Sequence, residues 1–376
     1  MNASRAFTTR HNALLSVGRV QTPVLALIYD REIEIEAFQS QTFYEVAAWF
    51  RQEGVEYRGL RQGDKLTDPA VAESIATSVK GKTGQITKYE AKQTKEYPYR
   101  LYDLTLLQRE ANAKYGYGAK KTLDIAQALY EKHKVISYPR TNSNYVTEQN
   151  IEAEYKQHTV LTEVEKHQFK TSVKELLSLG WKVVLGSADQ EQTGKKKTKK
   201  NSNEEEEAEE WTDKAFAVQP ELPVQCTKSE FKEKATQPPK SYTEGTLLKA
   251  MESAGKQIEN EELRDAMKDS GLGTPATRAA TIERLKNVGY ITMQGKKMQL
   301  TLKGRTAIEL IRKAGVDLLT SPEMTGQWER RLYQISKGEA GQDKFMENVK
   351  KFIMSIIDKV HAMDAGCHGW HNICTQ

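Results

Sequence analysis

The chain has 376 residues, enough for two or three domains of roughly 100 to 200 residues each. Its hydrophobic residues make up 38% and its charged residues 28%, so it can bury cores beneath a strongly hydrated surface. A net charge of +5 favours an anionic partner without identifying one. No apolar run is long enough for a membrane span, no signal peptide is visible, and three cysteines form no even disulfide framework, so we expect a cytoplasmic protein.

The first hundred residues predict one helix followed mainly by β structure. A helix beginning before Val20 should cover Val24–Asp30. Strands are then expected at Glu32–Phe38, where isoleucines alternate with acids, at Tyr44–Arg51 and at Gly84–Gln93. A further helix is expected at Pro69–Val79.

The next hundred residues predict a mostly helical module. Helices are expected at Leu104–Tyr115 and Lys120–Lys132, with glycines between them as the break. Further helical segments, at Glu148–Tyr155 and Thr162–Leu179, are expected to complete the module. The chain should then return to β structure through Phe216–Phe231.

A charge-segregated stretch interrupts this pattern. Lys195–Lys200 is almost entirely lysine and Glu204–Glu210 almost entirely glutamate, with nothing apolar to bury, which predicts a solvated loop. The alternative is a lysine arm that tethers DNA. It is less favoured because the adjacent acids would compete for the lysines.

From Ser241 onward the pattern is helical apart from one hairpin. Thr274 is a good N-cap and Pro275 suits the first helical position, so a helix should run from there through Asn287. Two short apolar stretches then flank Gln294-Gly295, which predicts a helix plus hairpin of winged-helix character. Thr277 and Arg278 would fall in the first helical turn, where backbone donors favour a phosphate. The alternative is a purely structural unit.

The most informative segment is Ile136–Val146, which reads I-S-Y-P-R-T-N-S-N-Y-V. Pro139 disfavours helix at Tyr138, which should therefore lie in an extended or turn conformation. Arg140 could bind a phosphate bidentately while Tyr138 attacks it. The alternative is a buried strand tyrosine followed by a surface arginine.

This segment resembles the active-site segment of type IA DNA topoisomerases, specifically the topoisomerase III branch, whose pattern is close to I-S-Y-P-R-T-D-S. The resemblance implies that Tyr138 is the nucleophile, which becomes joined to the 5′ end of the cut strand, and that Arg140 contacts the phosphate. Asn142 departs from the pattern, because an aspartate is usual there.

Other segments resemble family motifs in the family's order. They are Met1–Ala6, Ser16–Pro23, Leu107–Asn112, Ile125–Tyr130, Thr236–Lys240, Tyr242–Glu244 and Gly271–Ala279. By resemblance, the residues lining a groove for single-stranded DNA are Asn2, Arg5, Ser16, Val17, Gly18, Arg19, Val20, Gln21, Gln108, Asn112, Thr277 and Arg278. Alternatively, Arg5 and Arg19 cap local carboxylates, and Gln108 and Asn112 are helix-surface amides.

The resemblance implies a multidomain α+β fold, a toroidal type IA core with a helical active-site domain, a β-rich arch and a winged-helix-like DNA-binding domain. The expected segments are 1–40 (DNA gate), 41–97 (arch), 98–190 (active-site tyrosine domain), 191–210 (charged loop), 211–240 (arch) and 241–376 (DNA-binding domain and tail).

The family binds Mg²⁺ through a D-x-D pair in an N-terminal Toprim domain, and no D-x-D occurs in this sequence. Glu32, Glu34 and Glu36 are the nearest imitation, but an acidic strand face is the favoured interpretation. We therefore expect Mg²⁺ as the family's cofactor, with no metal ligand in this chain. The expected partners are DNA, preferably single-stranded, and a Toprim-bearing polypeptide in trans, but no membrane.

Two functions remain open. The first is a topoisomerase that cuts one strand and passes another through the gap. A phenol has an ordinary pKa of about 10, so its attack needs a base or electrostatic help, and turnover without Toprim should be impaired. The second is a non-catalytic single-stranded-DNA-binding remnant.

The tail, with Cys367, His368, His371 and Cys374, lacks a C-x-x-C pair, so a frayed terminus is favoured over a zinc site.

Overall fold

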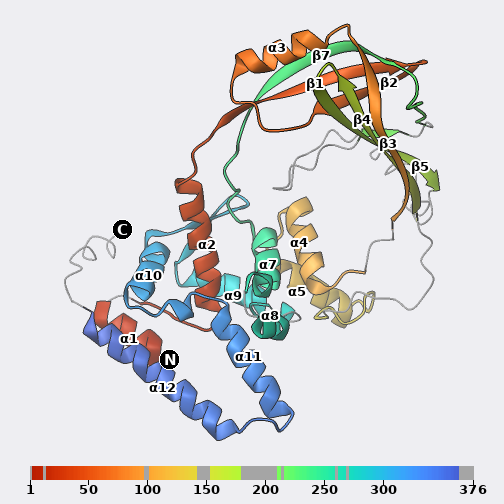
Figure 1. Ribbon diagram of the computed structural model, residues 1–376. Helices are drawn as coiled ribbons and strands as arrows, with labels where there is room; N and C mark the ends of the chain where they lie inside the picture. The colour runs from red at the N-terminus through yellow and green to blue at the C-terminus, as the bar shows by residue number, and fades with distance from the viewer. Residues whose placement is uncertain are drawn as a thin grey trace. The chain divides into compact units, whose positions relative to one another are not determined.

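The computed structural model describes residues 2–11, 14–96, 101–141, 153–178, 210–212, 216–258, 261–267 and 271–363. The chain forms two compact units (Figure 1). Unit 1 contains Met1–Ala37, Leu101–Tyr145 and Pro239–Gln376, and unit 2 contains Phe38–Arg100 and Val146–Pro238. Unit 1 is mainly helical and unit 2 mainly strand, so the predicted multidomain α+β class is confirmed.

Unit 2 contains a seven-stranded sheet among its described residues. The strand order is β2-β1-β7-β3-β4-β5-β6, and a short additional pairing of β2 with β5 closes the sheet on itself. The strands are β1 (Thr42–Gln52), β2 (Val55–Arg61), β3 (Thr83–Glu96), β4 (Ala153–Val164), β5 (His167–Ser178), β6 (Glu210–Thr212) and β7 (Val224–Ala235). Closure pairs the edge groups of β2 and β5 that would otherwise stay open.

Gly59 is required where β2 meets β5. A Cβ at this position would lie 2.9 Å from the Cβ of Phe169 and 3.0 Å from the ring of Phe50, so a larger residue would push these side chains apart. The two phenylalanines are fully buried and pack edge to face in the core of unit 2. The absence of a side chain at Gly59 therefore allows the sheet to close over a dense core.

Helix α3 (Pro69–Val79) has the predicted bounds, and it covers this sheet (Figure 1). The Asp68 carboxylate accepts the Ala70 N–H at 2.8 Å, and Pro69 occupies the first turn, so both local start signals act. Ile75 and Val79 lie on the buried face of the helix. A capped, proline-initiated amphipathic segment can be recognised from the sequence alone.

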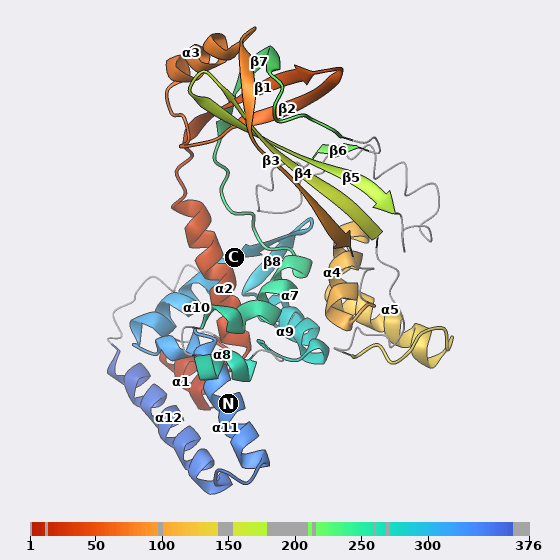
Figure 2. The ribbon, with the colours of Figure 1, turned by 45° about the vertical axis from the view of Figure 1, so that its right-hand side comes forward.

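The helices predicted at 148–155 and 162–179 are wrong where the chain is described. Residues 153–178 form the long antiparallel pair β4 and β5, side by side in Figure 2. Phe169, Thr171 and Val173 are buried at alternate positions, the period of a strand. Glu165, with a φ of 57°, turns the hairpin without a glycine, so the usual sequence signal was missing. Residues 148–152 lie outside the described residues.

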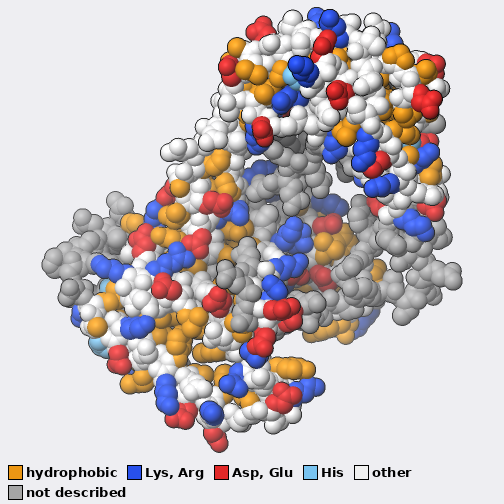
Figure 3. Space-filling view, in the orientation of Figure 1, with side chains coloured by type: hydrophobic (Ala, Val, Ile, Leu, Met, Phe, Trp, Pro, Cys, Tyr) orange, Lys and Arg blue, Asp and Glu red, His pale blue; other side chains and the backbone are white. Residues whose placement is uncertain are grey.

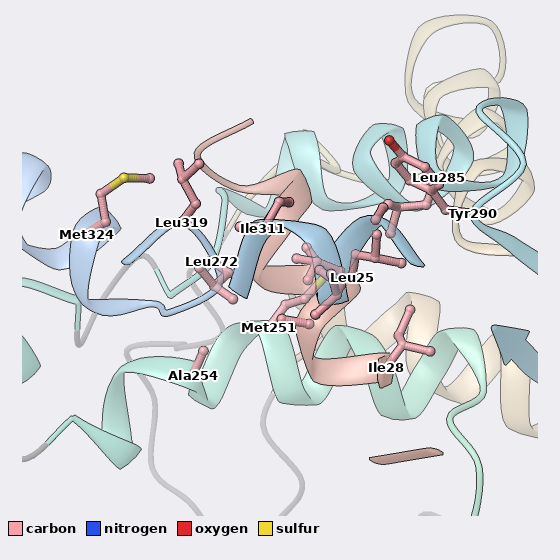
Figure 4. Close-up of a cluster of buried hydrophobic side chains, with 14 of the residues drawn as sticks. Leu25, Ile28, Met251, Ala254, Leu272, Leu285, Tyr290, Ile311, Leu319 and Met324 are labelled. Carbon is pink, nitrogen blue, oxygen red and sulfur yellow. The ribbon is translucent and has the colours of Figure 1, made fainter. Parts of the chain in front are cut away.

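Unit 1 packs its helices around one hydrophobic core (Figure 4). Leu25 from α2, Met251 from α7 and Leu285 from α9 contribute to this core. The helices are α1 (Asn2–His11), α2 (Gln21–Glu36), α4 (Leu104–Tyr115), α5 (Ala119–Glu131), α7 (Glu244–Ser253), α8 (Glu261–Met267), α9 (Pro275–Asn287), α10 (Leu302–Lys313), α11 (Glu323–Ser336) and α12 (Gln342–Ala362), with short 3-10 turns at Ala254–Gln257 and Asp317–Leu319. The predicted winged-helix hairpin is β8 (Ile291–Gln294) with β9 (Lys297–Leu300).

The strand predicted at Glu32–Phe38 is wrong, because α2 continues to Glu36. Glu36 accepts two hydrogen bonds from Arg305 of α10, at 2.6 and 2.9 Å, and Asp30 pairs in the same way with Arg312. Glutamate and isoleucine are compatible with a helix as well as with a strand. The hydrogen bonds of Glu36 with Arg305, some 270 residues later in the sequence, favour the helix at this position.

The helix predicted to begin before Val20 begins one residue after it, because Val20 is the N-cap of α2. The remaining predicted elements agree more closely with the structure. The helices at 69–79, 104–115 and 275–287 have the predicted ends, and α5 begins and ends one residue early.

No helix among the described residues is long and apolar enough to cross a membrane. Acidic and basic side chains are mixed over the visible face (Figure 3). The charged stretch 195–209 and the cysteine- and histidine-containing tail lie outside the described residues.

Candidate active site and DNA-contact residues

Residues 135–141 around Tyr138, here called the Tyr138 segment, are hydrogen-bonded at both ends to helices of unit 1. At the end of α5, the N–H groups of Lys132 and His133 both donate to the Ala128 carbonyl, and Val135 N–H donates to Leu129 O at 3.1 Å. At the other end, Leu104 N–H donates to Thr141 O at 3.1 Å. Tyr138 lies between these anchors in neither helix nor strand, in agreement with the effect predicted for Pro139.

Tyr138 is accessible to a large substrate. Its side chain is 57% exposed, which excludes the buried-tyrosine alternative. Its ring meets that of Tyr130 edge to face, with centroids 5.6 Å apart and an interplanar angle of 77°. Tyr130 therefore supports one side of the phenol and leaves much of it open to solvent.

Arg140 is held by the end of α5. One guanidinium nitrogen donates to Gln127 Oε1 at 2.8 Å, and the Gln127 amide nitrogen donates to Glu131 Oε1 at 2.7 Å. Gln127 and Glu131 are one helical turn apart, so the helix orients the acceptor that holds Arg140. A guanidinium has several donors, and one bond to a neutral amide leaves it able to bind a phosphate.

Sequence reasoning missed Gln127 and Tyr130 as part of this site. Both lie in the segment 125–130 that resembles a family motif, but the resemblance gives these two residues no role at the site. The i to i+3 spacing of these two residues, which places them near each other on a helix, was the available signal. Asn142 and Ser143 lie outside the described residues.

The loop Ser16–Val20 is braced from two sides. Ser16 N–H donates to the Tyr290 hydroxyl at 2.7 Å, and that hydroxyl donates to Ser16 O at 3.1 Å. Val17 exchanges two backbone hydrogen bonds with the Ser4 hydroxyl of α1. Gly18 N–H donates to the hydroxyl of Thr22. Val20 caps the start of α2, where Gln21 is buried.

Arginines of the predicted groove differ in their surroundings. Arg19 pairs with Glu329 of α11 at 2.9 Å, as its alternative predicted, and lies over the Trp328 ring at 5.9 Å. Arg5 and Asn2 are exposed on α1. A phosphate that engaged Arg19 would have to compete with the Glu329 carboxylate.

Thr277 and Arg278 lie in the first turn of α9, as predicted. Thr277 completes the cap, because its hydroxyl accepts the Thr274 N–H at 3.0 Å. Arg278 is 2% exposed and donates to Gly273 O at 3.0 Å and to the Thr105 hydroxyl at 2.9 Å. Burial lowers the pKa of Arg278, and the carboxylates of Glu252 and Asp103 partly offset this effect.

The hydrogen bond from Arg278 to Thr105 brings the start of α9 close to the Tyr138 segment. Thr105 follows Leu104, whose N–H holds Thr141, so Arg278 and the active-site segment meet on the first turn of α4. Gln108 and Asn112, further along α4, are buried. The alternative that these two are helix-surface amides is therefore wrong.

A family model described as DNA topoisomerase matches residues 1–154 and 148–347. The chain belongs to the DNA topoisomerase family. The resemblance to the type IA enzymes, topoisomerase III branch, is thereby confirmed.

Individual proteins show the same relationship. A DNA topoisomerase 3 of Bacillus cereus is 29% identical over 446 positions, covering 97% of this chain and 59% of its own length. The Haemophilus influenzae DNA topoisomerase 3 is 26% identical, covering 95% and 67%. Full-length topoisomerase I from Thermotoga maritima shares the fold, with a TM-score of 0.71 at 21% identity, over 95% of this chain and 66% of that one. This topoisomerase chain thus spans about three fifths of the Bacillus relative.

The matches between this chain and its relatives are not continuous. The alignment with the Bacillus protein has more positions than this chain has residues, so part of that relative has no counterpart here. The family model matches in two segments that overlap at 148–154, just before and at the start of β4.

A magnesium site is not formed by the described residues of this topoisomerase. Among them, no three His, Cys, Asp or Glu side chains come together in a way that could hold a metal ion. The charged residues next to Tyr138 in the chain, Lys134 and Arg140, are basic. Glu131 is an acidic neighbour of Arg140 through Gln127, but among the described residues it belongs to no group of three possible metal ligands.

Proposed function

We propose that this chain is the DNA-binding and strand-cleaving part of a type IA topoisomerase that forms a transient 5′-phosphotyrosine. The observation that carries this proposal is the exposed phenol of Tyr138 beside Arg140, in a segment that the family model matches. An exposed tyrosine alone would be ordinary. Its combination with a helix-held guanidinium two residues away is what phosphoryl transfer needs.

The reaction follows from the two side chains. The Tyr138 oxygen attacks the phosphorus, forming a P–O bond to the tyrosine while the bond from phosphorus to the 3′ oxygen breaks. The phenolic proton passes to a base, and the departing 3′ oxygen takes up a proton. Arg140 neutralises charge on the non-bridging oxygens as the reaction proceeds. Reversal by the 3′ hydroxyl reseals the strand and releases Tyr138.

For the DNA, we propose two roles among the groove residues. Exposed Asn2 and Arg5, with the loop Ser16–Val20 and the hydroxyl of Thr277, contact the backbone of a single strand. Four buried side chains hold these contacts in place from behind, and they are Gln21, Gln108, Asn112 and Arg278. A single strand is favoured because an exposed tyrosine must reach a phosphate without a second strand in the way.

For the cofactor, we propose that the Mg²⁺ ligands come from a Toprim-bearing segment or polypeptide outside these 376 residues. In the family, Mg²⁺ supplies charge neutralisation that Arg140 provides only in part. The chain's own residues would then bind the strand and supply the nucleophile. Efficient resealing and repeated strand passage would require the added Toprim part.

The test uses two labels on one single-stranded oligonucleotide. We expect the 3′-labelled strand, but not the 5′-labelled strand, to stay with the denatured protein, because the tyrosine joins the new 5′ end. Each label is tested with Mg²⁺, with and without an added Toprim polypeptide. Tyr138→Phe should abolish the adduct. The control Tyr115→Phe alters a tyrosine that is 71% exposed on the same unit and should keep it.

The second candidate function is a DNA-binding remnant without chemistry. It is favoured by the lack of a metal-binding cluster among the described residues. Tight binding of the oligonucleotide with no adduct under either condition would establish it and rule out the enzyme.

A further inference from the structure

The buried carboxylate of Glu244 contacts the N-terminus of α5, the helix that carries Gln127 and Tyr130. Glu244, the first residue of α7, is 4% exposed. One of its oxygens accepts the N–H of Ala119, the first residue of α5, at 2.6 Å. The other accepts a hydrogen bond from Lys286 of α9 at 2.5 Å. A single side chain thus connects three helices.

The carboxylate closely approaches Gly118, the N-cap of α5. A Cβ on Gly118 would lie 3.2 Å from one Glu244 oxygen and 3.3 Å from the other. A helix N-terminus attracts negative charge, and here the carboxylate occupies that position directly. The first N–H of α5, that of Ala119, is therefore satisfied by Glu244.

Two predicted groove residues belong to the same buried cluster. Asn112 accepts the Gly245 N–H at 3.2 Å and donates to Tyr117 O at 3.1 Å. Gln108 donates to Ala119 O at 2.9 Å. The turn between α4 and α5 is thereby fixed from both sides, by α4 and by α7.

The ammonium of Lys286 balances the negative charge of the Glu244 and Glu283 carboxylates. Burial lowers the pKa of Lys286, but its hydrogen bonds to Glu244 and Glu283 outweigh burial and leave the pKa above its usual value. Lys286 therefore remains an ammonium at neutral pH. Glu283 accepts a hydrogen bond from the same ammonium at 2.9 Å. Among the described residues no hydrogen bond joins Glu283 to α5, although it lines a surface pocket together with residues of that helix.

The cluster lies at one end of α5 and the active site at the other. Gln127, which holds Arg140, is eight residues beyond Ala119, or about 12 Å along a helix. Tyr130, which packs on Tyr138, follows within one further turn. A helix pivoting at its start would displace both supports at once.

We propose that Glu244 is a positioning residue for strand cleavage, which fixes α5 so that Gln127 and Tyr130 hold Arg140 and Tyr138 in register. This inference rests on the proposed function, because it needs the cleavage reaction. Because Glu244 is 4% exposed and bonds to Ala119 and Lys286, it has no contact with the DNA or the reacting atoms in this proposal. It should therefore affect the rate of the covalent step and leave the affinity for DNA alone.

The test compares Glu244→Gln with the matched control Glu283→Gln, under whichever condition gives an adduct with the wild type. At saturating oligonucleotide, we expect Glu244→Gln to slow adduct formation about ten- to a hundredfold. The oligonucleotide concentration for half-saturation should change less than about twofold. Glu283→Gln should match the wild type in both quantities.

A second variant separates positioning from loss of fold. In Glu244→Gln, the one amide oxygen must serve both Ala119 N–H and Lys286. Lys286→Met in the same chain frees that oxygen for Ala119, so the double variant should recover much of the rate. Circular dichroism and the thermal midpoint of each variant show whether it is folded.

The outcomes are distinguishable. A wild-type adduct with an equal rate in Glu244→Gln overturns this inference and leaves the proposed function intact. A lower affinity with an unchanged rate, or no recovery in the folded double variant, also overturns it. A wild type that forms no adduct under either condition overturns the proposed function, and the role of Glu244 with it.

Discussion

Arginines at three positions show how much surroundings determine the role of one side chain. Arg140 is exposed and has a neutral amide partner, which leaves it available to a phosphate. Arg19 is half-buried and paired with Glu329. Arg278 is enclosed, with a carbonyl and a hydroxyl as acceptors. The sequence motifs assigned all three to DNA, because a motif carries residue identity without exposure.

The burial of Arg278 predicts a structural cost when it is replaced. Arg278→Ala removes the hydrogen bonds to Gly273 and Thr105 and the ion pair with Glu252, and it leaves a cavity between α9 and α4. We therefore expect the free energy of unfolding to fall by about 3 kcal/mol. Arg140→Ala should change it by less than about 0.5 kcal/mol while reducing adduct formation. Urea unfolding measures the first quantity. Equal stability losses in the two variants would contradict the assignment.

Two buried tyrosines predict how stability depends on alkaline pH. Burial raises the pKa of Tyr57 in unit 2 to about 12, although its bond with Thr162 lowers it somewhat. Tyr290 in unit 1 has its pKa raised to about 12 by the same cause. The unfolded tyrosine ionises near pH 10, so the neutral buried form favours folding below that pH, and this contribution is lost as pH rises from about 10 toward 12.

We therefore expect the free energy of unfolding to decline over that range. In Tyr57→Phe the decline should become shallower, because phenylalanine has no proton to lose. Denaturant titrations at several pH values between about 8 and 12 measure it, with absorbance of tyrosinate recorded in parallel. Parallel curves for wild type and variant would show that Tyr57 ionises in the folded state as easily as in the unfolded state.

At the scale of elements, local signals explain what the sequence could predict. The helices at 69–79 and 275–287 begin with a capping residue and a proline, both of which act within one turn. The β4–β5 hairpin carries no such signal, and β4 pairs with β3 about seventy residues earlier. The Tyr138 segment could be located from its motif. Its supports Gln127 and Tyr130 could not be located in this way, because their positions depend on how α5 packs against α7 and α9.

The end of α2 is an element stabilised from a distance by charge. Arg312 of α10 donates to both oxygens of Asp30 and lies over the Tyr29 ring at 5.1 Å. We expect Arg312→Ala to lower the thermal midpoint at low salt, with the difference from wild type shrinking toward about 1 M salt. Lys351→Ala, which breaks an exposed pair within α12, is the control and should have less effect. A salt-independent loss would point to packing on Tyr29 instead.

At the scale of the whole molecule, the two units have separate hydrophobic cores. Leu248 is fully buried in the core of unit 1 and Val160 in that of unit 2. We expect two unfolding transitions, with Leu248→Ala lowering one midpoint and Val160→Ala the other. Differential scanning calorimetry of both variants checks this. A single transition that both variants shift would mean that the cores unfold together.

The interleaving of the units has a consequence for the order in which the protein folds during synthesis. Unit 2 is complete once Pro238 has left the ribosome, whereas the core of unit 1 waits for α7 to α12. At about 5 to 20 residues per second, the remainder takes on the order of ten seconds. The closed sheet can thus form first. The first and last residues of unit 2, Phe38 and Pro238, would then belong to an ordered sheet before the later helices of unit 1 are made.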